Sequence, residues 1–168
     1  DVWFLDKMER MTVLMEKYNM GCLYGESIKI DGDGNEIKAL NEGEEFDENV
    51  EQIPFTPSFY MVGGLGCCMC VNRRVVDKYL SLNLKNDDHD SQCPRIAVYY
   101  DSLWHLNAPV IKYRIHQNNT SNISGEFTFG SGEINKRISN TEMILEWMKK
   151  VSLDNEVDET HSRYIKQA

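Results

Sequence analysis

The most constraining feature of this sequence is the segment Leu106 to Ser124, which reads LNAPVIKYRIHQNNTSNIS. It opens with an apolar run from Pro109 to Ile111, whose β-branched residues and leading Pro are typical of the start of a strand. Because side chains alternate across a strand, we expect Arg114 and His116 on one face and Tyr113 on the other. A guanidinium beside an imidazole suits a phosphate or carboxylate ligand. The alternative is a partly exposed strand whose Arg and His pair with local acids, and both interpretations stay open here.

Length and charge exclude some classes of protein. The chain has 168 residues, which suits one domain with a hydrophobic core. Its 27 acidic and 18 basic side chains give a formal net charge of −9. This balance argues against a general nucleic-acid-binding protein and against broad attraction to anionic lipid.

The five cysteines do not have the pattern of a secreted disulfide framework, because their number is odd. Cys67 and Cys70 have the spacing of a zinc-binding pair, but no second pair or nearby His completes such a site. We therefore predict that Cys67, Cys68 and Cys70 are small buried hydrophobic residues. Free thiols fit a reducing cytoplasm, so we expect a cytoplasmic location.

The first residues have the spacing of an amphipathic helix. The apolar stripe consists of Met8, Met11, Met15 and Tyr18. Asp6 is in position to cap this helix, with Glu9 three residues later as its capping-box partner. The pattern predicts a helix from Lys7 to Tyr18 whose stripe packs in the core.

The region from Met20 to Ile30 has strand composition, and the turn sequence DGDGN follows from Asp31 to Asn35. We predict a hairpin whose second arm runs from Glu36 to Leu40. A calcium loop is the alternative, but Glu36 stands where such a loop needs Gly. The acidic segment from Asn41 to Gln52 is predicted to be a solvated loop.

Glycines and acids mark the middle of the chain. Val62 to Asn72 is apolar and Gly-rich, and Arg73 to Leu80 predicts a short helix whose N-terminus can receive an anion. Asp87, Asp88 and Asp90 then form the densest acid cluster. Asp90 can cap a helix that continues to Tyr100, in which Pro94 is tolerated only in the first turn. Alternatively, a carboxylate at this helix start can act as a general base.

Four segments resemble family 2 glycosyltransferases of the GT-A type, in that family's order. YRIHQNNTSN, from Tyr113, resembles the Y-R-x-H-x-x-N-x-S segment near the end of the family's catalytic domain. DVWFLDKMER, from Asp1, is similar to the residues that follow its acidic metal-binding motif. Gly66 to Arg73 resembles its glycine turn ending in Asn-Arg. His89-Asp90 resembles its H-D pair before a helix, although Ser91-Gln92 replaces the usual aromatic pair.

The resemblance implies an α/β fold in which residues 1–124 form the C-terminal, acceptor-side part of a GT-A catalytic domain, a partial mixed sheet flanked by helices. The nucleotide-binding half would precede Asp1, so we expect a piece of a longer enzyme that is inactive alone. The implied reaction moves a hexose-type sugar from a nucleotide sugar donor to a glycan or lipid-linked acceptor, with inversion.

The resemblance also implies roles for particular residues. Asp90, or Asp88 in its place, would accept the acceptor's proton as general base. Asp1 would be the last acid of a motif that holds Mg²⁺ or Mn²⁺, and His116 is a second candidate metal ligand. The residues that would contact the donor are Arg114 and His116 at the diphosphate, Tyr113, Asn119 and Ser121 in the adjoining loop, and Asn72 and Arg73 near the sugar nucleotide.

Residues 125–168 are predicted to form a helical C-terminal extension. The apolar residues that share its helical face are Ile134, Ile138, Leu145 and Met148. We expect this face to pack on the domain, and a homodimer interface or a peripheral contact at the inner face of the membrane are the alternatives. A non-catalytic binding or oligomerisation module is the rival function for the whole chain.

Overall fold

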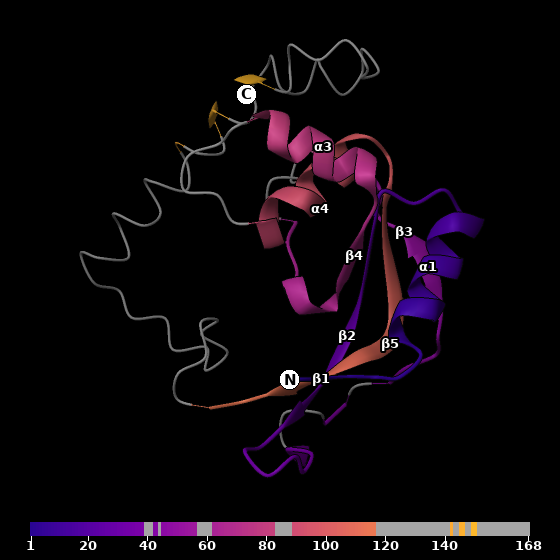
Figure 1. Ribbon diagram of the computed structural model, residues 1–168, viewed down its shortest axis with the longest axis vertical. Coiled ribbons are helices and arrows are strands. Elements are labelled where there is room, and N and C mark those ends of the chain that lie inside the picture. Colours follow the sequence, from indigo (N-terminus) through magenta and orange to yellow (C-terminus); the bar gives the residue numbers. More distant parts are fainter. Residues whose placement is uncertain are drawn as a thin grey trace.

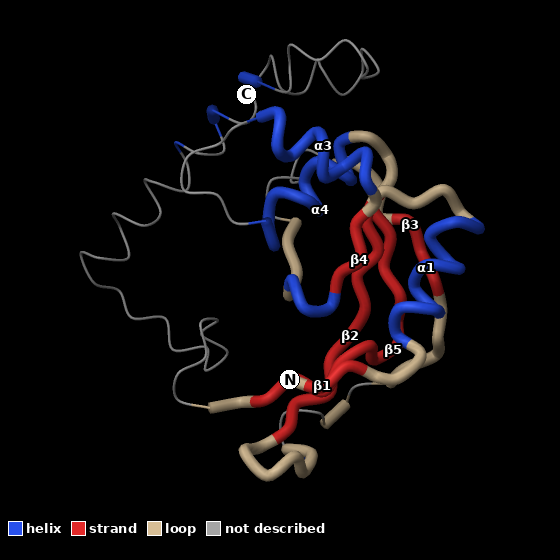
Figure 2. The backbone as a smooth tube through the Cα atoms, in the orientation of Figure 1, coloured by secondary structure: helices blue, strands red, loops and turns tan. Residues whose placement is uncertain are grey.

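The computed structural model describes residues 1–38, 42–43, 45–56, 62–82 and 89–116, with residues 142, 145–146 and 149–150 farther along. In this part of the chain, helices cover both faces of one mixed sheet (Figure 1, Figure 2). The strands are β1 (Val2–Trp3), β2 (Cys22–Ile30), β3 (Val50–Gln52), β4 (Met69–Val71) and β5 (Leu103–Arg114). The helices are α1 (Lys7–Lys17), α3 (Arg73–Leu82) and α4 (His89–Tyr99), with the short 3-10 helix η2 (Gly66–Cys68) before β4.

Strand β5 organises the sheet. One edge of β5 pairs in parallel with β2, and the other edge carries β3 near its start and β1 near its end, both antiparallel. Strand β4 pairs antiparallel with β2, so the strand order is β1-β5-β2-β4. The β2–β5 register shifts on both sides of Glu26, and such irregularities increase the local bend and twist of a sheet.

A hydrophobic cluster lies on each face of the sheet. Cys22 and Leu23 are successive residues of β2 and belong to opposite clusters, as strand alternation requires. Helices α3 and α4 cover the Cys22 side, where Ile96 is fully buried. Helix α1 covers the Leu23 side with Met11 and Met15. Burial of each such large side chain is worth about 1.5–3 kcal/mol relative to exposure.

The predicted α/β class is confirmed, and so are several elements within it. Helix α1 begins at the predicted residue and ends one position early, and β2 lies inside the predicted strand. The turn after Ile30 also forms, closed by an antiparallel bridge between Ile30 and Glu36. The Asp31 carboxylate accepts the backbone N–H groups of Asp33 and Asn35, which fixes this turn without a metal ion.

Two details of the predicted first helix are wrong. Asp6 is its N-cap residue but makes no side-chain capping bond, so there is no capping box with Glu9. Its carboxylate instead lies 3.9 Å from the guanidinium of Arg10. The apolar stripe is only partly core, because Met8 and Tyr18 are 46% and 40% exposed. A helix that packs on a sheet buries only the narrow face that meets the strands. Apolar residues at the margins of a broad stripe, here Met8 and Tyr18, therefore remain partly exposed to solvent.

The prediction of a solvated loop up to Gln52 is wrong at its end, where the chain forms β3. The strand pairs through its backbone with β5, from Val50 beside Leu106 to Gln52 beside Trp104. Its polar side chains conceal this pairing in the sequence, because an edge strand needs only backbone partners and tolerates solvent-facing charge.

The strand predicted to open at Pro109 is also longer than expected, because β5 starts at Leu103 and ends at Arg114. His116 lies beyond the end of the strand and is exposed, so strand alternation does not place it beside Arg114. Pro94 lies in the second turn of α4, not the first. The carbonyl that its missing N–H leaves without a helical partner, that of Asp90, accepts the Gly64 N–H at 3.3 Å.

The helical extension predicted over residues 125–168 lies largely outside the described residues. Residues 142, 145–146 and 149–150 are helical, and the Lys150 ammonium donates to the Leu82 carbonyl at the end of α3 at 2.5 Å. Among the helices that the structure describes, none has both the length and the apolar character needed to cross a bilayer.

Candidate functional site

The first and last of the family-like segments meet at the end of β5. Strand β1 pairs with β5, and the Asp1 carboxylate accepts the backbone N–H of Arg114 at 2.9 Å. The Arg114 guanidinium donates to the backbone carbonyls of Asp31 and Gly32, the first of these at 2.8 Å. Arg114 therefore contacts the start of the chain through its backbone and the turn after β2 through its guanidinium.

The other residues predicted around Arg114 have different environments. Tyr113 is 7% exposed, so it packs into the fold. His116 is exposed beyond the end of β5. Asn119 and Ser121 lie outside the described residues, as does Asp88, the alternative base. The structure thus brings Asp1 and Arg114 together through the backbone of β5.

Asp90 lies in the first turn of α4 and packs against the glycine turn before β4. A Cβ on Gly66 would come within 1.9 Å of Asp90 Oδ1, so no side chain fits between them. His89 Nε2 lies 2.7 Å from the same oxygen. The bond from the Gly64 N–H to the Asp90 carbonyl holds the backbone of the same residue. The glycine turn therefore positions both the backbone and the carboxylate of Asp90.

Lys7 connects the start of the chain to this glycine turn. Its side chain is 1% exposed, and its ammonium donates to the Cys67 carbonyl at 2.5 Å. The same nitrogen lies 4.1 Å from the centre of the Trp3 ring. Burial lowers the pKa of Lys7 below its ordinary value. A continuous set of contacts thus runs from Trp3 through Lys7 to Cys67, and Gly66, the next residue back, touches Asp90.

Asn72 and Arg73 have structural contacts. The Asn72 side-chain oxygen accepts the Val75 N–H at 2.9 Å and caps α3, while its amide nitrogen donates to the Met20 carbonyl at 2.9 Å. Arg73 is exposed and pairs with Asp77 one helical turn later at 2.8 Å. These contacts lie at the start of α3, and cap chemistry explains why Asn precedes this helix.

Sequence reasoning missed a polar group on the sheet itself. His105 of β5 lies 2.7 Å from Glu26 of β2 and 3.6 Å from Glu51 of β3, and its ring stacks on Tyr24 with centroids 4.7 Å apart. Burial and the nearby carboxylates raise the pKa of Tyr24. The sequence feature that could have indicated this polar group is Glu26, an acid within an apolar strand, where acids are depleted. Its partners come from strands that only the topology brings together.

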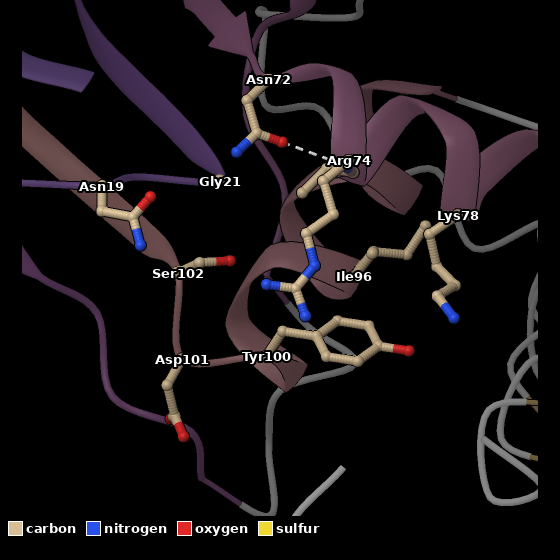
Figure 3. A pocket seen from close by; sticks show the side chains of 10 residues that line it. Asn19, Gly21, Asn72, Arg74, Lys78, Ile96, Tyr100, Asp101 and Ser102 are labelled. Atoms are coloured by element: carbon tan, nitrogen blue, oxygen red, sulfur yellow. Dashed lines mark hydrogen bonds between the residues drawn. The ribbon is translucent and has the colours of Figure 1, made fainter. Parts of the chain in front are cut away.

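A cavity of about 140 Å³ lies where β2 and β5 begin (Figure 3). Asn72 and Ser102 line it close to Gly21, and Arg74 and Lys78 line it from α3. Both cations lie over the Tyr100 ring, at 5.8 and 5.5 Å from its centre. The volume matches that of a small ring-sized molecule, about 150 Å³. This cavity is at the opposite end of β5 from Arg114, so it does not belong to the cluster around Asp1.

A divalent cation would need more ligands than this part of the chain offers. Among the described residues, no group of three or more His, Cys, Asp or Glu side chains converges as a metal site requires. Asp1 offers a carboxylate, but one of its oxygens already accepts the Arg114 N–H. The described residues therefore include no ligand group of this kind for Mg²⁺ or Mn²⁺.

Comparison of the chain with protein families, with curated proteins and with solved structures gave no match in any of the three.

Proposed function

We propose that this chain is the acceptor-side part of a sugar-nucleotide-dependent glycosyltransferase similar to the GT-A family 2 enzymes. It would move a hexose-type sugar to a glycan or lipid-linked acceptor with inversion. The observation that carries the proposal is the position of Asp90, whose carboxylate is wedged against Gly66 at the start of α4. A base that must take one proton from one hydroxyl needs a position fixed in this way.

The contacts of Lys7 support the proposal because they connect two family-like segments that are far apart in the sequence. Trp3 and Lys7 belong to the segment that begins with Asp1, and Cys67 belongs to the glycine turn. Asp90 touches that turn from the other side. The Lys7 contacts thus hold the segment after Asp1 against the glycine turn that touches Asp90.

In this proposal, Asp90 accepts the proton of the acceptor hydroxyl as its oxygen attacks the anomeric carbon. The donor's diphosphate leaves from the opposite side, which inverts the configuration. Arg114 would contribute its positive charge at the turn after β2, where its guanidinium lies against Asp31 and Gly32. The divalent cation and most of the donor site would come from other parts of the intact protein.

The test uses the full-length gene product that contains this sequence, with Mn²⁺ or Mg²⁺ and a panel of nucleoside-diphosphate hexoses. Asp90→Asn should lower kcat by about 10²–10⁴-fold, the usual contribution of a general base. Asp77→Asn is the matched control, because Asp77 is an exposed carboxylate on α3 that pairs with the exposed Arg73 one helical turn away. Its kcat should stay within about twofold, since exposed pairs contribute little.

Two outcomes contradict the proposal at different levels. Unchanged turnover in folded Asp90→Asn removes Asp90 from the mechanism, and a loss in Asp88→Asn would then assign the base to Asp88. Absence of transfer from every nucleotide sugar, by a protein with native circular dichroism, overturns the enzymatic function itself.

A non-catalytic binding module is the second candidate, and the exposed apolar residues near α1 favour it. Leu5, Met8 and Val13 are 107%, 46% and 57% exposed, although scattered exposed apolar residues are common on monomers. Sedimentation of the full-length protein distinguishes the two functions. Concentration-dependent association that Val13→Asp abolishes, together with absent transfer, would favour the module.

A further inference from the structure

The five cysteines differ in exposure, although the sequence predicts burial for the cluster of three. Cys22, Cys68 and Cys93 are buried, as expected. Cys67 and Cys70 are only partly buried, so solvent and small molecules reach them. The prediction of burial is therefore wrong for these two. They lie at the two ends of the Cys-x-x-Cys segment, in η2 and β4, and form a natural pair for comparison.

The surroundings of Cys67 are those of an activated thiol. Its sulfur shares a hydrogen bond with the Cys68 thiol. The ammonium of Lys7 is bonded to the Cys67 carbonyl at 2.5 Å, which places a positive charge beside the residue. Reactive cysteines are partly exposed and lie next to such donors and cations, while structural cysteines are buried in apolar surroundings.

The two partly exposed thiols titrate in opposite directions. The hydrogen bond with Cys68 and the charge of Lys7 outweigh burial and lower the pKa of Cys67 to about 7. At Cys70 burial outweighs Lys7 and raises the pKa. Cys67 is therefore about half thiolate at neutral pH, and Cys70 is almost entirely thiol.

We propose that Cys67 is a modification site, a nucleophilic thiol that hydroperoxides and other soft electrophiles modify in preference to the other four cysteines. With a hydroperoxide, the thiolate sulfur attacks the nearer oxygen, an S–O bond forms and the O–O bond breaks. The sulfur loses two electrons, the peroxide gains them, and the departing oxygen leaves as water or an alcohol after taking a proton. The product is a sulfenic acid, which thiol reductants reverse.

The neighbours of Cys67 give the modification a consequence for the proposed transferase. Gly66 precedes Cys67 and is in contact with Asp90, with no space for even a methyl group between them. An added oxygen or larger group on Cys67 would lie one residue from this contact, and we expect it to shift the turn and Asp90 with it. This consequence rests on the proposed function, whereas the preferential modification of Cys67 does not.

The test is a competition among cysteines in the native full-length protein. Reductant is removed, substoichiometric iodoacetamide is added at pH values from 5.5 to 9.5, and fragment-ion spectra give the labelling rate at each position. Thiolate fraction and intrinsic nucleophilicity together predict that Cys67 reacts at least about threefold faster than Cys70 at pH 7 and at least about sixfold faster at pH 6. The Cys67 rate should reach half its maximum at about pH 7.

Variants separate activation from simple exposure. Lys7→Met and Cys68→Ala should each slow labelling of Cys67 at pH 7 and move its midpoint upward, while Lys7→Arg and Cys68→Ser should preserve most of the rate. A second measurement uses hydrogen peroxide and a sulfenic-acid trap, which should label Cys67 in the wild type and no site in Cys67→Ser. Cys70→Ser is the matched control and should trap as the wild type does.

The proposal is overturned if Cys70 reacts as fast as Cys67 in the native protein, or if Cys67 reacts only in denaturant. Both results come from the wild type alone, so they stand even if a variant fails to fold. If Cys67 is preferentially labelled but transfer is unaffected, the modification site holds and only its link to Asp90 fails.

Discussion

Gly21 and Gly66 each lie so close to a polar side chain of a neighbouring element that a Cβ would collide with it, and the two contacts serve different purposes. A Cβ on Gly21 would come within 2.3 Å of Ser102 Oγ, and one on Gly66 within 1.9 Å of Asp90 Oδ1. The Ser102 hydroxyl donates to the Ala97 carbonyl, and its backbone carbonyl accepts the Gly21 N–H. At Gly21 the polar groups of Ser102 thus form hydrogen bonds with the backbone, so this contact has a structural role.

At Gly66 the polar partner is a carboxylate that can gain and lose a proton. It lies at the start of α4 and packs against Gly66, the residue before Cys67, whose carbonyl accepts the Lys7 ammonium. The close approach at Gly21 therefore fixes the starts of β2 and β5, whereas the close approach at Gly66 orients the ionisable carboxylate of Asp90. Substitutions at the two glycines should separate stability from activity.

The largest expected effect is on turnover in Gly66→Ala. The new methyl group must push the Asp90 carboxylate aside, and a displacement near 1 Å costs about a hundredfold in rate. Stability should fall by only about 1 kcal/mol, because the far end of one side chain can rotate. Gly64→Ala is the control, since its nearest neighbour would be Met69 Sδ at 4.0 Å and the N–H bond to Asp90 remains. If Gly66→Ala and Gly64→Ala have the same kcat, the contact between Gly66 and Asp90 does not matter for turnover, and the difference proposed between Gly66 and Gly21 is wrong.

Gly21→Ala should show the opposite balance. Its Cβ would also come within 2.9 Å of Ser102 Cβ and 3.0 Å of Val75 Cγ2, so no single side-chain rotation relieves the contact. We expect the free energy of unfolding to fall by about 1–3 kcal/mol, the usual cost of overpacking. Urea unfolding measures this loss, and kcat per folded molecule should stay at the wild-type value. A variant with normal stability and impaired turnover would contradict the structural assignment.

Asn72→Ala should reduce stability by about 0.5–2 kcal/mol, because α3 loses its cap. The bond from the Asn72 amide to the Met20 carbonyl disappears as well. Asn72→Asp is the control, since its carboxylate still caps the helix and only the bond to Met20 is lost. If Asn72 instead binds the sugar nucleotide, as the resemblance implies, Asn72→Ala raises KM for the donor with stability unchanged.

The smallest effect is on acid stability in Asp31→Asn. Hydrogen bonds from Asn35 lower the pKa of Asp31 in the folded protein. A carboxylate with a lowered folded pKa stabilises the protein above its unfolded pKa of about 3.9, and this contribution is lost as pH falls through the folded pKa. Urea midpoints of Asp31→Asn should therefore decline less than the wild type between about pH 4 and pH 2. Asp33→Asn, in the same turn, should keep the wild-type decline.

Local patterns predicted those parts of the fold that are decided locally. The spacing of Met11 and Met15 indicated α1, and the DGDGN sequence indicated the turn that Asp31 holds. Strand β3 could not be predicted, because Val50–Gln52 owes its conformation to β5 rather than to its own side chains. The capping role of Asn72 was available from its place before a helix, but the resemblance favoured a ligand contact instead.

The candidate site likewise has parts that the sequence predicts and parts that depend on the tertiary fold. The H-D pair and the Arg114 segment could be read from the chain, but their surroundings could not. That Arg114 contacts the turn after β2 depends on the parallel pairing of β2 with β5. The exposure of Cys67 and its proximity to Lys7 likewise arise only when α1 packs beside η2, and no spacing of cysteines encodes that.

The pairing of Val2 with Lys112, and of Cys22 with Leu103, has a consequence for biosynthesis. A ribosome adding about 5–20 residues per second needs roughly 4–16 s to make the ~80 residues between β2 and its parallel partner. Until then β1 and β2 emerge with unsatisfied edges, and contacts of such long range also form slowly. We therefore expect slow codons between the two strands to lower the yield of folded protein, and rapid elongation or chaperones to protect the nascent polypeptide during this interval.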